Sequence, residues 1–228
     1  MSDDLSGKVW ISSVLSNHDI GMKQGTRTKF YNREWNPAKF EIPAEPKEVY
    51  QAARRHKQGY VLQRSEFPEA EAVFHEERFT QIREIFYVGP FLAVKRKLAE
   101  ALSRFDLGVG GLIPFPIYKA DLVTPIEEEC FLLNFGARKN TILPEQSKNV
   151  VKFAVDRKTG TQIWDVNSWH EDGDVVLTPA ALEGSDLWFE EIVYNKIFLS
   201  DALASALQDA GIADDWRLKQ CRILEAGQ

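Results

Sequence analysis

A short apolar strand that runs directly into an amphipathic helix occurs twice in this sequence, and this pattern restricts the fold more than any other. The two copies lie within residues 89–105 and 194–210. Four helix positions match without a gap, namely Leu98, Ala99, Ala101 and Leu102 in the first copy and Leu203, Ala204, Ala206 and Leu207 in the second. These residues recur at the three- and four-residue spacing of one buried helix face. The pattern therefore predicts two helices that each cover an apolar surface.

The second copy carries signals for both ends of its helix. Ser200 is a good N-cap, and Asp201 lies where the helix dipole favours an anion. Gly211 can adopt the left-handed conformation that ends a helix. A β-like segment follows each helix, at Gly111–Tyr118 and at Trp216–Ile223, so each copy is a strand–helix–strand unit. Because one such unit cannot bury its apolar face alone, we expect both to pack in the same or adjoining sheets.

A β-hairpin is predicted between the two units. Val150–Val155 and Thr161–Val166 both alternate apolar and polar residues, and Asp156–Gly160 between them has the composition of a turn. Together with the repeated units, the hairpin predicts an α+β fold. We expect mostly antiparallel sheets with flanking helices and an internally repeated strand–helix–strand unit.

The N-terminal part has weaker patterns. Lys47–Lys57 has apolar residues at helical spacing and predicts a short helix, followed by a strand at Tyr60–Leu62. Two further helical stretches are expected within Glu69–Arg83. This organisation suggests an N-terminal region of residues 1–88 and a region of residues 89–228 that holds both units, although the two regions can equally form one continuous domain.

Composition is that of a folded protein, with 44% hydrophobic and 27% charged residues in a chain of 228. Met1–Ser6 is acidic and polar, so we expect no export signal and a cytoplasmic location. No apolar run has the length of a membrane span. Cys130 and Cys221 are far apart in the sequence, and we expect reduced thiols packed in the core.

The negative charge is concentrated in the last third of the chain. Residues 161–228 contain four Lys and Arg against thirteen Asp and Glu. Such a surface repels phosphate backbones and attracts a basic protein, so we expect a protein partner and no nucleic acid. The alternative is that these acids only keep the protein soluble.

Sequence motifs for catalysis are weak. The glycines within Gly108–Gly111 follow a helix instead of a strand, which disfavours a dinucleotide site. Trp169–Asp174 contains a histidine and three acids but no second histidine at metal-ligand spacing, and a solvated turn is the simpler interpretation. Glu127–Glu129 is interpreted as a solvated charge run. We therefore expect no catalytic residue, no metal ligand and no cofactor.

Two tryptophans are flanked by acids, which is typical of a surface that receives a basic partner. The candidate partner-binding residues are Asp186, Trp188, Glu190, Glu191, Asp214, Asp215 and Trp216. For both tryptophans, core packing is preferred to the interface interpretation.

The segment from Asp186 to Ile212 resembles the C-terminal signature of immunity family eleven of the bacterial polymorphic toxin systems, formerly a domain of unknown function. The resemblance lies in Asp186-Leu187-Trp188, in the strand and helix start from Lys196 to Leu203, and in the Ala210-Gly211-Ile212 turn. The earlier copy, with Phe131–Asn134, is similar to the middle of such proteins. The acids at Asp214-Asp215 depart from the family pattern.

The resemblance implies an immunity protein that binds a cognate toxin in the producing cell and blocks its active site or substrate access. A basic toxin such as a nuclease would suit the acidic C-terminal third. It implies no catalytic residues. The alternatives are an enzyme that uses the His170–Asp174 loop and a self-associating adaptor protein.

Overall fold

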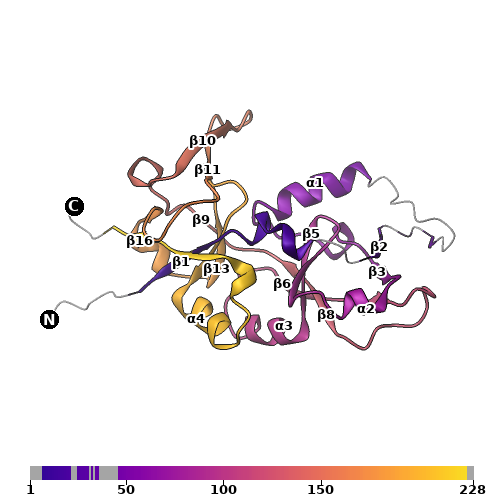
Figure 1. The fold of residues 1–228 in the computed structure, drawn as a ribbon. Coiled ribbons are helices and arrows are strands. Elements are labelled where there is room, and N and C mark those ends of the chain that lie inside the picture. Colours follow the sequence, from indigo (N-terminus) through magenta and orange to yellow (C-terminus); the bar gives the residue numbers. More distant parts are fainter. Residues whose placement is uncertain (1–6, 22–24, 31, 33, 36–45, 225–228) are drawn as a thin grey trace.

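The computed structural model describes residues 7–21, 25–30, 32, 34, 35 and 46–224. Met1–Ser6, expected to lack an export signal, lies outside the described residues. The described part contains four α-helices and sixteen strands, and most of the strand pairs are antiparallel (Figure 1). The predicted α+β class is therefore confirmed.

The largest sheet has five strands and joins the two ends of the described chain. Its order is β15 (Leu218–Gln220), β1 (Val9–Ser12), β14 (Ile197–Ser200), β13 (Leu187–Glu190) and β9 (Arg138–Lys139). β1 pairs antiparallel with both β14 and β15, so an N-terminal strand lies between two C-terminal ones. Residues from both predicted regions thus share one sheet.

The second largest sheet has four strands and is antiparallel throughout. Its order is β4 (Ile85–Val88), β5 (Phe91–Lys95), β8 (Cys130–Asn134) and β6 (Gly111–Phe115). β4 and β5 form a hairpin, and the expected division between residues 88 and 89 falls inside it.

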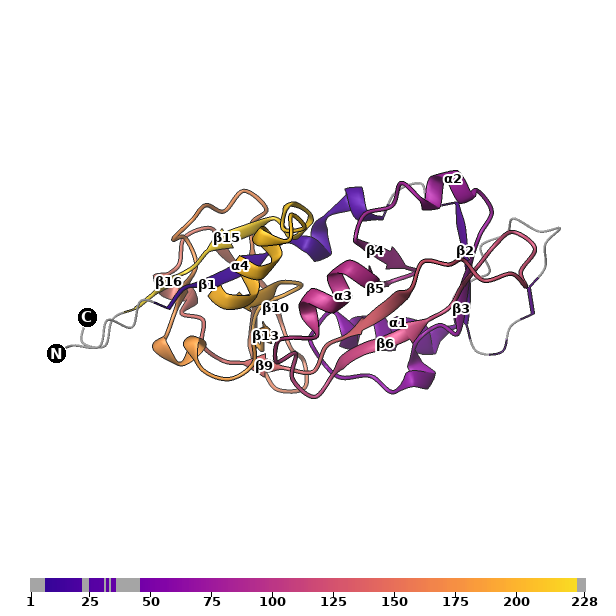
Figure 2. The same ribbon diagram turned by 90° about the horizontal axis from the view of Figure 1, so that it is seen from below.

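The two predicted helices each continue the second strand of a hairpin. α3 (Arg96–Leu102) follows β5, and α4 (Asp201–Asp209) follows β14. The helices contact each other beneath the sheets (Figure 2). Their apolar faces belong to one buried cluster that includes Leu98, Leu102, Leu203 and Leu207. The two units therefore lie in adjoining sheets with their helices in contact, while an internal repeat stays a prediction.

The predicted ends of α4 are confirmed. The Ser200 hydroxyl accepts a hydrogen bond from the Leu203 N–H at 3.2 Å, which satisfies one of the free donors at the start of the helix. Gly211 has a φ of 66°, in the left-handed region that favours glycine after a helix.

A small sheet of β2 (Thr26–Lys29), β3 (Ala70–Val73) and β7 (Ile117–Tyr118) lies beside the four-stranded one. α1 (Lys47–His56) confirms the helix predicted there, and it buries Val49, Ala52 and His56. The helical prediction for Glu69–Arg83 is wrong in its first half, because β3 is an extended strand between β2 and β7. Only the four-residue α2 (Glu76–Phe79) is helical in that segment.

The strand predicted at Tyr60–Leu62 is also wrong. The side-chain amide of Asn134 donates to the Leu62 carbonyl at 2.9 Å and accepts from the Leu62 N–H at 3.0 Å. A side chain thus satisfies both backbone groups that a neighbouring strand would otherwise satisfy.

Both β-like segments predicted after the helices are interrupted. In Gly111–Tyr118, Pro116 separates β6 from β7, and β7 pairs with β3 instead of continuing in the four-stranded sheet. In Trp216–Ile223, Arg217 has a left-handed φ of 51°. β15 follows it, and the short β16 (Arg222–Ile223) pairs with β12 (Val176–Leu177) in a separate parallel pair.

Both cysteines, Cys130 and Cys221, are free and buried. None of the helices in the described part of the chain has the length and apolar character needed to cross a membrane.

Candidate protein-interaction surface

The two tryptophans predicted to contact a partner are completely buried. Trp188 and Trp216 both have 0% exposure. Trp188 stacks on Phe198, and its indole N–H donates to a carboxylate oxygen of Glu190 at 3.0 Å. The prediction of surface anchors is therefore wrong for both residues, and the competing interpretation of core packing holds.

Glu190 is buried as well, so it is not available to a partner. Its carboxylate accepts hydrogen bonds from the Thr141 N–H at 2.6 Å and from the Ile142 N–H at 3.1 Å. The Thr141 hydroxyl and the Trp188 indole also donate to it. A buried carboxylate with four donors acts as a structural link between β13 and the segment after β9.

Two of the other four predicted residues are partly buried and have partners within the chain. Asp186 accepts hydrogen bonds from the Ser200 hydroxyl at 2.6 Å and from the Asp106 N–H at 2.9 Å. Asp215 forms an ion pair with Arg83.

Glu191 and Asp214 are the two exposed members of the predicted set. Glu191 follows β13 and lies 3.7 Å from Arg138 in an ion pair. Asp214 lies in the short 3-10 helix Asp214–Trp216. Partner binding by these two side chains stays a prediction.

The histidine in Trp169–Asp174 is buried, so the predicted solvated turn is wrong at that position. His170 has 3% exposure, and its Nδ1 lies 2.7 Å from the Asn167 carbonyl oxygen. Desolvation by burial lowers its pKa. The Asp172 carboxylate accepts from the Gln220 N–H at 2.7 Å and so fastens this loop to β15.

The described residues contain no group of three or more His, Cys, Asp or Glu side chains that could hold a metal ion. Two hollows of about 390 and 570 Å³ both include Glu69 in their lining. The Glu69 carboxylate forms an ion pair with Lys29 at 3.6 Å.

The predicted hairpin is confirmed, and we call it the arm: β10 (Val150–Val155), β11 (Gln162–Val166) and the turn between them. It projects from the upper side of the molecule (Figure 1). Every residue of β10 after Val150 is exposed. Val151, Phe153 and Val155 are 45%, 53% and 57% exposed, which is unusual for three apolar side chains in one strand.

β10 has a strand neighbour on one side only. β11 pairs with β10 on one edge, and its other edge is occupied by the segment before β14. There the Trp164 N–H donates to the Ile192 carbonyl, and the Tyr194 N–H donates to the Trp164 carbonyl, both at 2.8 Å. Within the described residues, β10 is therefore an edge strand.

Aromatic contacts connect the arm to the body of the protein. The Phe153 ring stacks on Tyr194 with a centroid distance of 4.5 Å and an interplanar angle of 20°. Within the arm, the Lys152 ammonium lies 5.7 Å from the centroid of the Trp164 ring and so links β10 to β11. Such contacts hold the arm in a defined position, so that its exposed side chains are presented on an ordered support.

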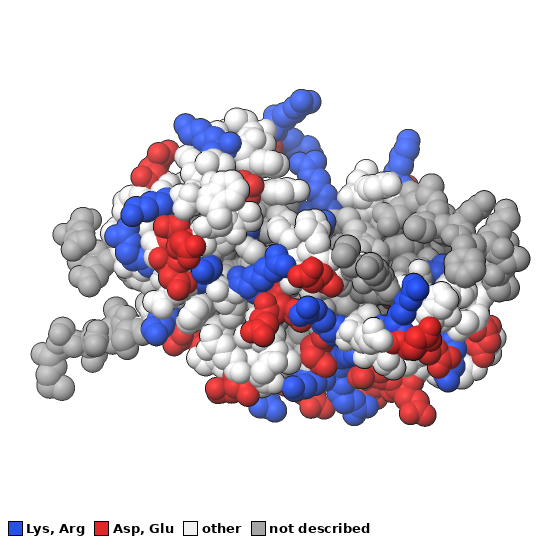
Figure 3. Space-filling model, in the orientation of Figure 1, with Lys and Arg blue, Asp and Glu red and all other residues white. Residues whose placement is uncertain are grey.

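The arm and its base are basic. Lys148, Lys152, Arg157 and Lys158 are all exposed, and none forms an ion pair with another described residue. Figure 3 shows Lys and Arg side chains at the upper end of the arm. The combination of apolar side chains and unpaired cations is the main feature of this surface.

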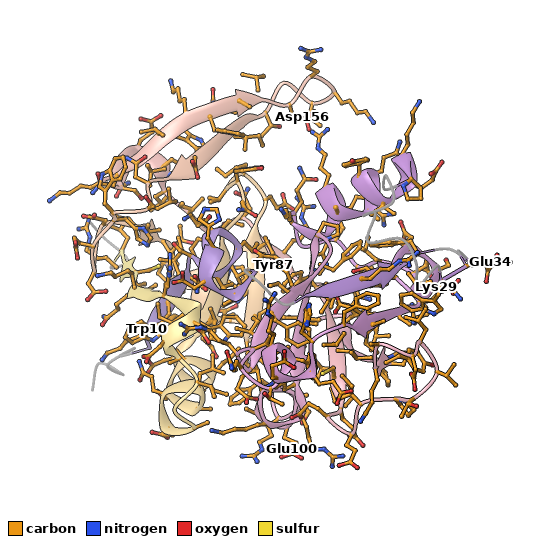
Figure 4. The ribbon with its side chains drawn as sticks, turned by 45° about the vertical axis from the view of Figure 1, so that its right-hand side comes forward. Trp10, Lys29, Glu34, Tyr87, Glu100 and Asp156 are labelled. Carbon is orange, nitrogen blue, oxygen red and sulfur yellow. The ribbon has the colours of Figure 1, made fainter. Side chains whose placement is uncertain are left out.

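The one acid in the turn of the arm is held by its own backbone. The Asp156 carboxylate accepts hydrogen bonds from the N–H groups of Lys158 at 2.7 Å and Thr159 at 3.2 Å. These bonds lower the pKa of Asp156, and the charge of Arg54 in α1 lowers it further. Asp156 lies at the top of the arm, on the side of the molecule where α1 is found (Figure 4). α1 therefore adds positive charge near the turn.

No family model matches this sequence, and searches of the curated proteins and of the solved structures gave no match either.

Proposed function

We propose that this chain is a cytoplasmic immunity protein that binds a cognate bacterial toxin and neutralises it by stoichiometric occlusion. The observation that carries the proposal is the arm, whose β10 strand exposes Val151, Phe153 and Val155 on an ordered edge. Apolar and aromatic side chains on a rigid support are the usual anchors of a protein interface. The likeness of the Asp186–Ile212 segment to an immunity family supplies the class of partner.

Occlusion needs a stable interface, and the arm has suitable chemistry for one. A stable complex buries about 800 Å² on each partner, and most of its affinity comes from a few well-packed residues. Phe153 is the largest exposed side chain of β10, and Tyr194 already supports its ring. A toxin that covers Phe153 would gain an aromatic contact without the cost of ordering a mobile side chain.

A basic toxin remains part of the proposal because residues 161–228 carry a large excess of acids. Several of these acids already have partners within the chain, such as Glu190 with Thr141 and Asp215 with Arg83. Favourable long-range attraction toward a basic protein requires only the net charge and not free carboxylates.

Co-expression tests the proposal. The chain should restore growth to cells that express the toxin encoded by the neighbouring reading frame, and the two proteins should co-purify as a complex of fixed ratio. Loss of both results would overturn the proposal. The variant Glu171→Ala, which changes an exposed acid of the His170–Asp174 loop, should protect cells as well as the unchanged chain.

Two outcomes would favour the alternatives. Turnover of a small molecule that is lost in Glu171→Ala would indicate an enzyme. Elution of the purified chain as a defined oligomer, without affinity for the toxin, would indicate a self-associating adaptor.

A further inference from the structure

The free edge of β10 exposes backbone hydrogen-bonding groups as well as side chains. Lys152 lies opposite Trp164 in the antiparallel ladder. Both backbone groups of Trp164 bond to residues 192 and 194 on the far side of β11. Opposite residues in such a ladder are either hydrogen-bonded to each other or point their backbone groups away. The N–H and C=O of Lys152 therefore point outward, toward the open edge.

Apolar side chains lie on both faces of this edge. Val151 is opposite Asp165 and so shares a face with it. The register shifts between Lys152 and Ala154, which places Val155 opposite Gln162, on the same face as Trp164. An added strand projects its side chains alternately to the two faces, so it would find an apolar neighbour on each.

The positive charge of the arm favours one kind of added strand over others. Lys148 and Lys152 lie at the base and middle of β10, and Arg157 and Lys158 lie in the turn. A second copy of the chain is disfavoured, because edge-to-edge pairing of two arms would bring two basic segments together. A segment with acidic residues would neutralise these cations.

We propose that the toxin, which is basic as a whole, presents one acidic, extended segment that pairs with the outer edge of β10 and becomes the third strand of the arm. This inference rests on the proposed function only for the identity of the partner. Backbone bonds to Lys152 supply the register, and apolar contacts to Val151, Phe153 and Val155 supply affinity. Acidic side chains that approach the four cations supply selectivity.

Two features of the β10 edge disfavour pairing with strands other than an acidic one. A lysine in the middle of an edge strand and a bulge beside it both discourage pairing with other strands. Lys152 is that lysine, and Phe153 lies at the shift in register. A partner strand without an acid near Lys152 would bury an unpaired charge, whereas an acidic strand would not.

A proline at position 152 tests strand addition directly. Lys152→Pro removes the outward N–H together with the lysine side chain and leaves the hydrogen bonds to β11 in place, while the control Lys152→Ala removes the same side chain and keeps the N–H. Titration with the purified toxin should show that Lys152→Pro binds about tenfold more weakly than Lys152→Ala. Equal affinity of the two variants would overturn strand addition, even where the unchanged chain still protects cells.

A second pair of variants covers the case in which the proline distorts the arm. Arg157→Glu and Lys158→Glu change only exposed turn residues. Their combination should weaken the equilibrium affinity for the toxin about tenfold at low salt, because the local contacts with the acidic segment are lost, and the difference should shrink at high salt. An unchanged affinity would overturn the proposal that the paired segment is acidic. Tight binding of a single-stranded oligonucleotide, with no binding of the toxin, would show that the arm binds nucleic acid and would overturn the inference. Failure of the unchanged chain to bind the toxin or to protect cells would instead count against the proposed function.

Discussion

β13 and β10 look alike in the sequence but have opposite environments in the structure. Each is a short apolar strand with aromatic residues inside it, Trp188 and Phe189 in β13 and Phe153 in β10. All four residues of β13 are buried, whereas five of the six residues of β10 are exposed. β13 lies between β14 and β9, while β10 has only β11 beside it. Composition alone therefore does not decide which of the two strands is core and which is surface.

The charged residues of the two strands follow the same division. The Glu190 carboxylate is buried and accepts four hydrogen bonds from three residues. Lys152 is exposed, and its backbone groups point to an open edge. The hydrogen-bonding groups of Glu190 in β13 have partners within the chain, whereas the outer backbone groups of β10 are open to a binding partner.

The largest effect is expected from truncating the aromatic residue of the buried strand. Trp188→Ala should lower the free energy of unfolding by about 3–5 kcal/mol, because it leaves a cavity in the core. Phe153→Ala should cost less than about 1 kcal/mol, since that ring is half exposed. Urea denaturation of both variants measures the difference. Similar losses in the two variants would contradict the contrast between β13 and β10.

A second buried carboxylate sharpens the comparison, because it has fewer donors than Glu190. Glu71 in β3 accepts from the Thr28 hydroxyl at 3.2 Å, and hydrogen bonding by Thr26 and Thr28 lowers its pKa less than burial raises it. Burial raises its pKa from 4.5 to about 7. The unfolded chain therefore loses this proton at lower pH than the folded chain does. Stability from this group is present below pH 4.5 and is lost as the pH rises to about 7.

Glu71→Gln should remove that dependence on pH. At pH 8 the variant should be more stable than the unchanged chain by up to about 3 kcal/mol, and the gain should vanish near pH 4. Urea midpoints across this range measure it. His56 contributes in the opposite direction, because burial lowers its pKa to about 3 and stability is lost as the pH falls from 6.5. The difference between variant and unchanged chain cancels the His56 contribution.

Glu190→Gln tests the link between β13 and Thr141. The amide group would point two hydrogens toward groups that also donate, so stability should fall by about 2 kcal/mol. The matched control is Glu191→Gln at the neighbouring exposed position, which should change stability by less than about 0.5 kcal/mol. A neutral Glu190→Gln in thermal or urea unfolding would show that the four hydrogen bonds contribute little.

The smallest change in stability is expected in the arm. Val155→Glu should alter the free energy of unfolding by less than about 0.5 kcal/mol, because the side chain is already more than half exposed. Val123→Glu is the control, since Val123 is also exposed but lies in the turn after β7. Only Val155→Glu should weaken binding to the toxin. Equal affinity of both variants for the toxin would show that β10 is not part of the interface.

Local signals in the sequence predicted the elements whose ends are set by nearby residues. Ser200 and Gly211 identify the limits of α4, and the Asp156–Gly160 turn identifies the arm. At Tyr60–Leu62 a strand was predicted but none forms. Asn134, from a distant part of the chain, makes the hydrogen bonds to the Leu62 N–H and carbonyl that a neighbouring strand would make. No local pattern records a contact of that kind.

The candidate site was misplaced for the same reason. Trp188 and Glu190 have the composition of an interface, and only the positions of β14 and β9 show that they are buried. One signal for the arm was present in the sequence. Lys148, Lys152, Arg157 and Lys158 surround an apolar strand, and such basic residues are typical of an edge that faces solvent.

Hydrogen–deuterium exchange of the chain, alone and with its toxin, tests the central claim most directly. The account predicts that toxin binding slows exchange in β10, at Val150–Val155, and leaves β13 and the Asp214–Trp216 turn unchanged. Slower exchange confined to the Asp214–Trp216 turn or Glu191, with β10 unaffected, would contradict it and would return the interface to the acidic C-terminal third.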